Sequence, residues 1–159
     1  MVDLSRRGFF RGRPRPRAEL RPPWALSEER FIDQCTRCNE CLKACPQKIL
    51  VAGDGGYPTV DFKLGECTFC GDCLSVCQPK ALLRQDADQS AWPYKAAIGE
   101  DCLPHQGVEC RVCGDFCDVR AIRFAPRLGG SPLPDIDTEL CTGCGACVVA
   151  CPVVAISVR

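Results

Sequence analysis

The chain has 159 residues, of which 16 are cysteines and 7% are aromatic, and its 20 basic and 20 acidic side chains leave no net charge at neutral pH. A body without an excess of basic residues argues against a nucleic-acid-binding protein, and no apolar run approaches the roughly 18 residues that a membrane-spanning helix needs. With so few aromatic side chains, small domains would be marginal on apolar burial alone, so we expect cysteine chemistry to contribute to the fold.

Residues 1–26 are predicted to form an arginine- and proline-rich flexible tail. Residues 1–21 hold seven arginines against two acidic residues. Such a segment folds back onto the acidic body that carries the cysteines, binds an acidic partner or membrane surface, or remains solvated. Residues 5–11, S-R-R-G-F-F-R, resemble the twin-arginine export motif. The apolar region and cleavage site of a working signal do not follow. We therefore expect the protein to stay in the cytoplasm, where reducing conditions suit thiol ligands.

Four cysteine runs follow the tail, and three of them share the spacing C-x2-C-x2-C-x3-C. This spacing is typical of bacterial ferredoxins, in which thiolates hold [4Fe–4S] clusters. Three closely spaced thiols on one loop can reach one cube, whereas the fourth, on a short helix that leaves the loop, ligates the other cluster of a pair. Pro46 and Pro152 would end that helix early. The regular runs are run one (Cys35, Cys38, Cys41 and Cys45), run two (Cys67, Cys70, Cys73 and Cys77) and run four (Cys141, Cys144, Cys147 and Cys151).

Run three is irregular, because seven residues separate its first two cysteines. We predict that its thiols also bind a cluster, so that the chain holds three to four [4Fe–4S] clusters according to whether this run is filled. His105 lies in the long spacer, where we expect a surface residue rather than a substitute ligand. The cysteines of run three are Cys102, Cys110, Cys113 and Cys117.

Two other uses of cysteine compete with this interpretation. A small secreted disulfide scaffold has a similar cysteine content, but such a scaffold has no reason to repeat three cysteines within seven residues. Structural zinc usually joins two separated C-x2-C pairs in one tetrahedral site. Here every run carries four cysteines and the chain has one histidine. Iron–sulfur binding is the favoured prediction.

The sequences around the runs repeat as well. Short apolar stretches follow the runs at residues 49–51, 81–83, 121–124 and 155–158, as expected for paired strands, and glycine-rich turns at 53–56 and 129–132 predict hairpins. The expected fold class is α+β, with two tandem bacterial 2[4Fe–4S] ferredoxin-like modules, short hairpins, short helices and a flexible N-terminal tail. We place module one, with runs one and two, at residues 27–90, and module two, with runs three and four, at 91–159. A nested pairing, of run one with four and of run two with three, stays open.

Beyond its cysteine spacing, the chain resembles the NapF family, which are cytoplasmic ferredoxin-type accessory proteins of the periplasmic nitrate reductase system. The resemblance rests on the S-R-R start, on R-P-P-W at residues 21–24, on G-G-Y-P at 55–58 and on the irregular third run. It implies that the protein is not an enzyme. It also implies that its partner is the catalytic subunit of the periplasmic nitrate reductase, in the cytoplasmic precursor form. The implied role is to help assemble the iron–sulfur centre of that subunit before export.

A plain electron carrier is the alternative function. A ferredoxin that passes single electrons between oxidoreductases would need the same cysteine runs, and the chemistry in either role belongs to the cluster rather than to a catalytic side chain. Trp24 and Trp92 are expected to be packing residues in both cases.

Overall fold

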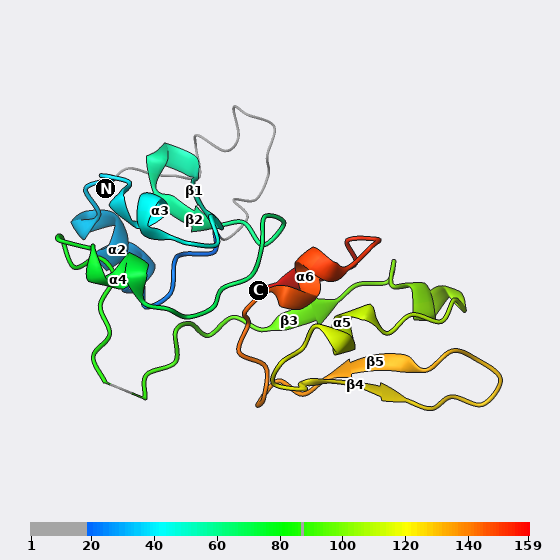
Figure 1. Ribbon diagram of the computed structural model, residues 1–159. Coiled ribbons are helices and arrows are strands. Elements are labelled where there is room, and N and C mark those ends of the chain that lie inside the picture. Colours follow the sequence, from blue (N-terminus) through cyan, green and yellow to red (C-terminus); the bar gives the residue numbers. More distant parts are fainter. Residues whose placement is uncertain (1–18, 87) are drawn as a thin grey trace.

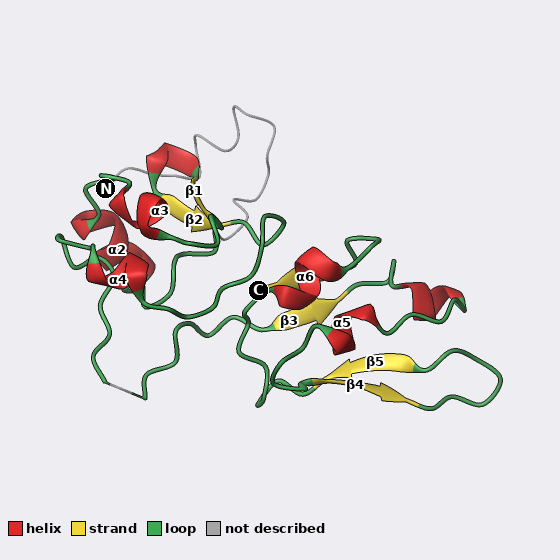
Figure 2. Ribbon diagram, viewed as in Figure 1, coloured by secondary structure: helices red, strands yellow, loops and turns green. Residues whose placement is uncertain are grey.

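Two lobes built from short helices and short strands make up the protein (Figures 1 and 2). The computed structural model describes residues 19–86 and 88–159. Among these residues, each strand pairs with one other strand, and the three resulting two-stranded sheets are all antiparallel. Within the described ranges, no helix has the length and apolar character needed to cross a bilayer. The mixture of helix and strand agrees with the predicted α+β class.

The first lobe contains runs one and two. Its β1–β2 hairpin turns at the predicted glycine-rich segment, with Leu50 opposite Val60. The short helices α3 and α4 each begin one residue before the third cysteine of their run, and they contact one another. The elements are α2 (Glu28–Gln34), α3 (Glu40–Ala44), β1 (Leu50–Ala52), η1 (Asp54–Gly56), β2 (Pro58–Val60) and α4 (Asp72–Ser75).

The second lobe contains runs three and four. The hairpin of β4 and β5 again turns at the predicted glycine-rich segment, and β6 pairs with β3 across most of the lobe's sequence, so that Ala96 lies opposite Val158. Both predicted hairpins are therefore confirmed. The elements are β3 (Ala96–Ile98), η2 (Leu103–Gln106), α5 (Val112–Asp115), β4 (Ile122–Ala125), β5 (Leu133–Ile136), α6 (Ala146–Ala150) and β6 (Ile156–Val158).

One tight turn recurs after all four cysteine runs. The third residue beyond the last cysteine of each run has a left-handed backbone, with φ between 52° and 57°. Its N–H donates to the carbonyl of that cysteine at 2.8 to 3.3 Å. The turn directs the next two residues into the core. The left-handed residues are Lys48, Lys80, Arg120 and Val154, and the buried pairs that follow are Ile49 and Leu50, Ala81 and Leu82, Ala121 and Ile122, and Ala155 and Ile156.

Residues 19–26 are packed onto the first lobe, which differs from the expectation of a flexible tail up to residue 26. The N–H of Leu26 donates to Ala81 and the N–H of Leu83 donates to Trp24, so this segment pairs with the chain after run two. β3 pairs with the chain after run four in the same way. The segment thus supplies the first lobe with a counterpart of β3. The rest of the predicted tail, with its twin-arginine-like motif, lies outside the described residues.

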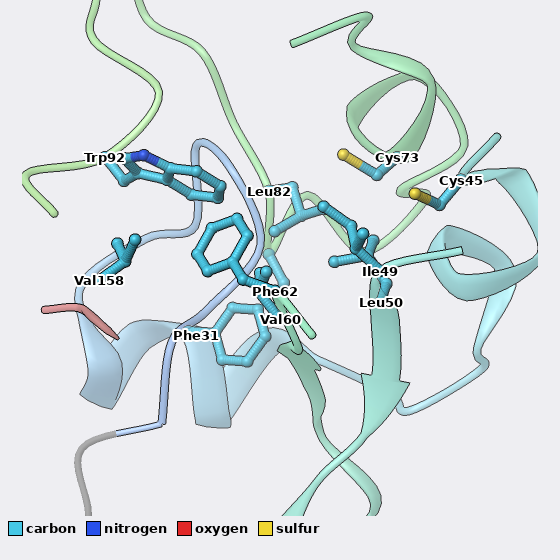
Figure 3. Close-up of a cluster of buried hydrophobic side chains, with 11 residues drawn as sticks. Phe31, Cys45, Ile49, Leu50, Val60, Phe62, Cys73, Leu82, Trp92 and Val158 are labelled. Carbon is cyan, nitrogen blue, oxygen red and sulfur yellow. The ribbon is translucent and has the colours of Figure 1, made fainter. Parts of the chain in front are cut away.

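The apolar core is small and contains cysteines. In the first lobe, Phe31, Ile49 and Leu82 are almost wholly buried, and Cys45 and Cys73 border them (Figure 3). Trp92 also belongs to this core, with its ring in edge contact with Phe62, which confirms its predicted packing role. A second core in the other lobe is made of Ala96, Cys113, Ala121, Ile122, Cys141, Cys147 and Ile156.

Candidate iron–sulfur centres

Runs one and two exchange their fourth cysteines. Cys77 of run two lines one hollow together with the first three thiols of run one. Burial, and after it the negative charge on these neighbouring thiolates, raises the pKa of the Cys41 thiol. In Figure 3, the sulfur atoms of Cys45 and Cys73 lie near one another. We call the two sets group I (Cys35, Cys38, Cys41 and Cys77) and group II (Cys45, Cys67, Cys70 and Cys73).

Each of these two groups lines its own hollow. The group I hollow spans about 360 Å³ of space between atoms and the group II hollow about 350 Å³, part of it open to solvent. Each hollow is bordered by four cysteines drawn from two runs. Among the described residues, no three His, Cys, Asp or Glu side chains converge on a point suited to one metal ion. The thiols instead surround a larger space, as a cube of four irons and four sulfides requires.

Runs three and four make the same exchange. The pKa of the Cys102 thiol is raised by burial and by the charges of Cys151 and Cys110, and Cys117 lies close enough to raise the pKa of Cys147. We call the sets group III (Cys102, Cys110, Cys113 and Cys151) and group IV (Cys117, Cys141, Cys144 and Cys147). The structure thus has the sequential arrangement of runs, not the nested one, and the sixteen predicted cysteines lie in four sets of four.

The loops of the regular runs share one backbone conformation. In runs one, two and four, the second and fourth residues after the first cysteine have positive φ: Arg37 and Asn39, Phe69 and Gly71, and Gly143 and Gly145. In run three, Arg111 next to Cys110 has φ −131° instead. Cys102 reaches group III from the start of η2, and the backbone N–H of His105 at 2.9 Å from the Cys102 carbonyl holds that turn. The long spacer therefore folds as a short helix that returns the chain to its group, and the exposed His105 side chain lies on the surface as expected.

Burial favours the neutral form of several of these thiols. Desolvation raises the pKa of the Cys73 and Cys147 thiols to about 12 and those of Cys41, Cys67 and Cys113 to about 11, from an ordinary value of 9.0. Other thiolates in the same group raise these pKa values further. Four anionic sulfurs in one group are therefore costly unless a positively charged metal core compensates them.

Main-chain N–H groups point at several of these sulfurs. The sulfur of each of three fourth cysteines accepts an N–H from the chain just after the tight turn: Cys77 from Leu82 at 3.4 Å, Cys117 from Ala121 at 3.2 Å and Cys151 from Ala155 at 3.3 Å. The Cys67 sulfur accepts the N–H of Phe69 at 3.4 Å. Such donors stabilise thiolates and tune the potential of a bound cluster. The donor set and its surroundings thus fit an anionic iron–sulfur cube.

Exposure distinguishes the two groups of the first lobe from those of the second. Cys38 in group I and Cys70 in group II are exposed, whereas every cysteine of groups III and IV is buried or half-buried. A cluster in either group of the first lobe would therefore have one ligand near solvent.

Two parts of the chain match known family models. Residues 34–81 match the model of a 4Fe-4S dicluster domain, and residues 134–157 match that of a 4Fe-4S binding domain. These ranges hold runs one, two and four, and run three lies between them. The protein therefore contains ferredoxin-type 4Fe-4S binding domains.

The chain is also similar over its length to curated proteins. It is 46% identical to ferredoxin-type protein NapF of Escherichia coli (strain K12), over 98% of this chain and 94% of the relative. It is 43% identical to ferredoxin-type protein NapF of Haemophilus influenzae, over 99% and 94%. Methylamine utilization ferredoxin-type protein MauM of Methylobacillus flagellatus is 32% identical, over 95% of this chain and 72% of the relative. At this identity and coverage, the chain belongs to the NapF family of ferredoxin-type iron–sulfur proteins.

Proposed function

We propose that the protein carries four [4Fe–4S] clusters, one in each thiol group. The observation that supports this count most strongly is that Cys102 lies with Cys110, Cys113 and Cys151, which completes a fourth set despite the irregular spacing. The sixteen cysteines Cys35, Cys38, Cys41, Cys45, Cys67, Cys70, Cys73, Cys77, Cys102, Cys110, Cys113, Cys117, Cys141, Cys144, Cys147 and Cys151 are the proposed iron ligands. A bound cluster supplies one-electron chemistry.

We further propose that the protein is a cytoplasmic accessory factor without enzymatic activity of its own. Its partner is the precursor of the catalytic subunit of the periplasmic nitrate reductase, which it helps to mature, by assembly of the iron–sulfur centre, before export. Family membership supports this role, and the reduced thiols that the groups need suit the cytoplasm. The exposed Cys38 and Cys70 give a client protein access to the first lobe.

A one-electron carrier that serves other oxidoreductases is the second candidate. It is favoured by a specific contact, because group II and group IV come from different lobes and yet adjoin through the main chains of Cys67 and Cys144. A series of neighbouring clusters suits electron transport, whereas a donor of clusters has no need of it.

Two measurements test these proposals. Iron and acid-labile sulfide in anaerobically purified protein should each reach about sixteen per chain, and about twelve would leave one group unfilled. For the role, the protein should bind the precursor of the catalytic subunit more tightly than the mature enzyme, measured by pull-down with equal amounts of each. Equal binding of the two forms would contradict the maturation role and support the carrier.

A further inference from the structure

The two lobes meet at the loop of run four. The N–H of Cys67 in the first lobe donates to the carbonyl oxygen of Cys144 at 2.8 Å. Two side chains add bonds to this loop: the Trp92 indole N–H, from the chain between the lobes, donates to the Thr142 carbonyl at 3.0 Å, and the ammonium group of Lys95, directly before β3, donates to the Cys141 carbonyl at 2.6 Å. The first lobe and the chain between the lobes thus both hold the loop of run four.

The contact leaves no room for a side chain at Gly143 or Gly145 in the loop of run four. A Cβ on Gly145 would overlap the ring of Phe62, and one on Gly143 would overlap the carbonyl oxygen of Tyr94 and lie 2.8 Å from the Trp92 indole nitrogen. The matching residue in run two, Gly71, has the same left-handed backbone, with φ 84° against 86° at Gly145, but nothing lies within 4 Å of its Cβ position. The left-handed backbone is thus common to both loops, whereas only the loop of run four is closely covered by residues from elsewhere in the chain.

Apolar packing continues across the same boundary. Trp92 contacts the rings of Phe62 and Phe69, with centroid distances of 5.7 and 5.6 Å. Val158 at the end of β6 belongs to the core of the first lobe, and Val148 on α6 packs against the cores of both lobes. The lobes therefore share buried surface and do not merely follow one another along the chain.

The thiol groups adjoin one another in space. In the first lobe, α3, which carries Cys41 of group I, contacts α4, which carries Cys73 of group II, and in the second lobe α5, with Cys113 of group III, contacts α6, with Cys147 of group IV. The main-chain bond from Cys67 to Cys144 joins group II to group IV. The order in space is therefore I, II, IV, III, which differs from the order of the runs in the sequence.

We propose that the Cys67–Cys144 main-chain bridge, enclosed by Phe62, Trp92 and Gly145, is a fixed junction that positions group II against group IV, so that the four groups form one continuous series through the molecule. This inference rests on the proposed function for the contents of the groups. The junction itself is a property of the chain. The protein then acts as one four-centre unit in place of two independent ferredoxin modules, and Phe62, Gly145 and Trp92 are its positioning residues.

Cleavage between the lobes tests the junction. A protease site inserted after the exposed Asp88 allows the folded, iron-loaded protein to be cut, and iron content is measured before and after. The halves of the cut wild type should stay together as one particle near 17.4 kDa on size-exclusion chromatography. Separation of the halves, with their iron retained, would overturn the proposal.

Three variants with the same cleavage site separate the junction from general damage. Gly145→Ala should let the cut halves part, whereas Gly71→Ala, the matched control, should leave them joined. Adding Phe62→Ala to Gly145→Ala makes room for the new methyl group and should restore association. Equal behaviour of Gly145→Ala and Gly71→Ala would contradict the role of this contact. If Gly145→Ala loses its iron, the cut wild type decides the question alone.

Electron paramagnetic resonance tests the proximity of the groups. In the fully reduced intact protein, magnetic coupling between group II and group IV should give a spectrum that differs from that of the cut, separated halves of Gly145→Ala. A spectrum equal to the sum of the two halves would overturn the proposed series. Low iron content in the wild type would instead contradict the proposed function, so the two failures are distinguishable.

Discussion

The guanidinium group of Arg21 donates to both carboxylate oxygens of Glu28, at 2.9 and 2.6 Å, from a residue that is only 8% exposed. The same guanidinium contacts Glu19 at 2.9 Å and lies 5.0 Å from the centroid of the Phe31 ring. These contacts fix residues 19–26 on the first lobe. The segment of residues 19–26, which contains R-P-P-W, is therefore part of the folded first lobe and not a flexible tail.

Replacing Arg21 should destabilise the first lobe. Arg21→Ala removes charged hydrogen bonds and a cation–π contact, which together are worth about 2 kcal/mol when the partners remain partly exposed. The cluster absorbance of the variant should be lost at a lower temperature than in the wild type. Arg30→Ala, at an exposed position in the same region, is the control and should leave the transition unchanged.

The exchange of fourth cysteines predicts an unusual pattern in double variants. Cys102→Ser and Cys151→Ser should each remove the same cluster, so the double variant should keep about twelve irons, as each single variant does. Cys102→Ser with Cys117→Ser damages groups III and IV together and should leave about eight irons. If Cys151 served the other cysteines of its own run, the two double variants would give the reverse result.

Relief of backbone strain at Val154 should stabilise the second lobe. Val154 is β-branched, has φ 53° and is 63% exposed, so its side chain adds strain without much burial. Val154→Gly removes the cost of holding valine in a left-handed backbone, roughly 1–2 kcal/mol, but increases the conformational entropy of the unfolded chain. The net gain in stability is about 0.5–1 kcal/mol. The thermal loss of cluster absorbance should shift upward. The neighbouring Val153→Gly, which relieves no positive φ, should shift it downward.

Iron loading should release protons, and acid should reverse it. Burial raises the pKa of the Cys73 and Cys147 thiols to about 12, so these thiols are protonated in the metal-free fold at pH 7.5. Raised pKa values of this kind stabilise a metal-free fold below the ordinary thiol pKa, and that contribution is lost as the pH rises toward 12. The loaded protein follows the opposite trend, because ligands must deprotonate to bind metal.

A pH titration measures this prediction. Reconstitution in weak buffer at pH 7.5 should release about four protons per thiol group from the thiols, in addition to the protons that hydrosulfide loses as it enters the cube. The visible absorbance of the loaded protein should fall as the pH is lowered from neutrality. Stability of the clusters that decreased from pH 7 to 9 instead would contradict the expected sign.

Lys95 should raise the reduction potential of a cluster in group IV. Its ammonium group donates to the Cys141 carbonyl at 2.6 Å, which holds a positive charge beside this group. Lys95→Met should lower one potential, on the order of tens of millivolts, since the reduced cluster carries more negative charge. A redox titration followed by electron paramagnetic resonance measures the change. Lys63→Met, at an exposed site, should have no effect.

The cysteine runs and the hairpins were predictable because their signals are local. Spacing of two and three residues determines which thiols share a loop, and glycine-rich turns between apolar stretches predict hairpins such as β1–β2. The sequential pairing of the runs was the expected arrangement. The position of Cys102 was not predictable from local signals, because nothing in the seven-residue spacer indicates that the spacer forms η2 and returns the chain to group III.

The packing of residues 19–26 and the contact between the lobes were not predictable from local pattern. Arginine and proline favour a disordered segment by composition. Tertiary partners explain the burial instead: Glu28 and Phe31 contact Arg21, and the main chains of Leu83 and Ala91 bond that of Trp24. Gly143 and Gly145 look like ordinary loop glycines in the sequence. A Cβ atom at Gly145 would overlap Phe62 and one at Gly143 would overlap Tyr94, and both of these residues are remote in the chain.

The exchange of ligands also has a consequence for biosynthesis. Group I is complete only when Cys77 has been synthesised, and group III only when Cys151 has been synthesised. The first cysteine loop of each lobe therefore lacks one ligand until the second run of that lobe has been translated. A cube delivered to a nascent lobe before that point would find three of its four anchors. Metal delivery to each lobe is therefore best timed after the whole lobe has been translated.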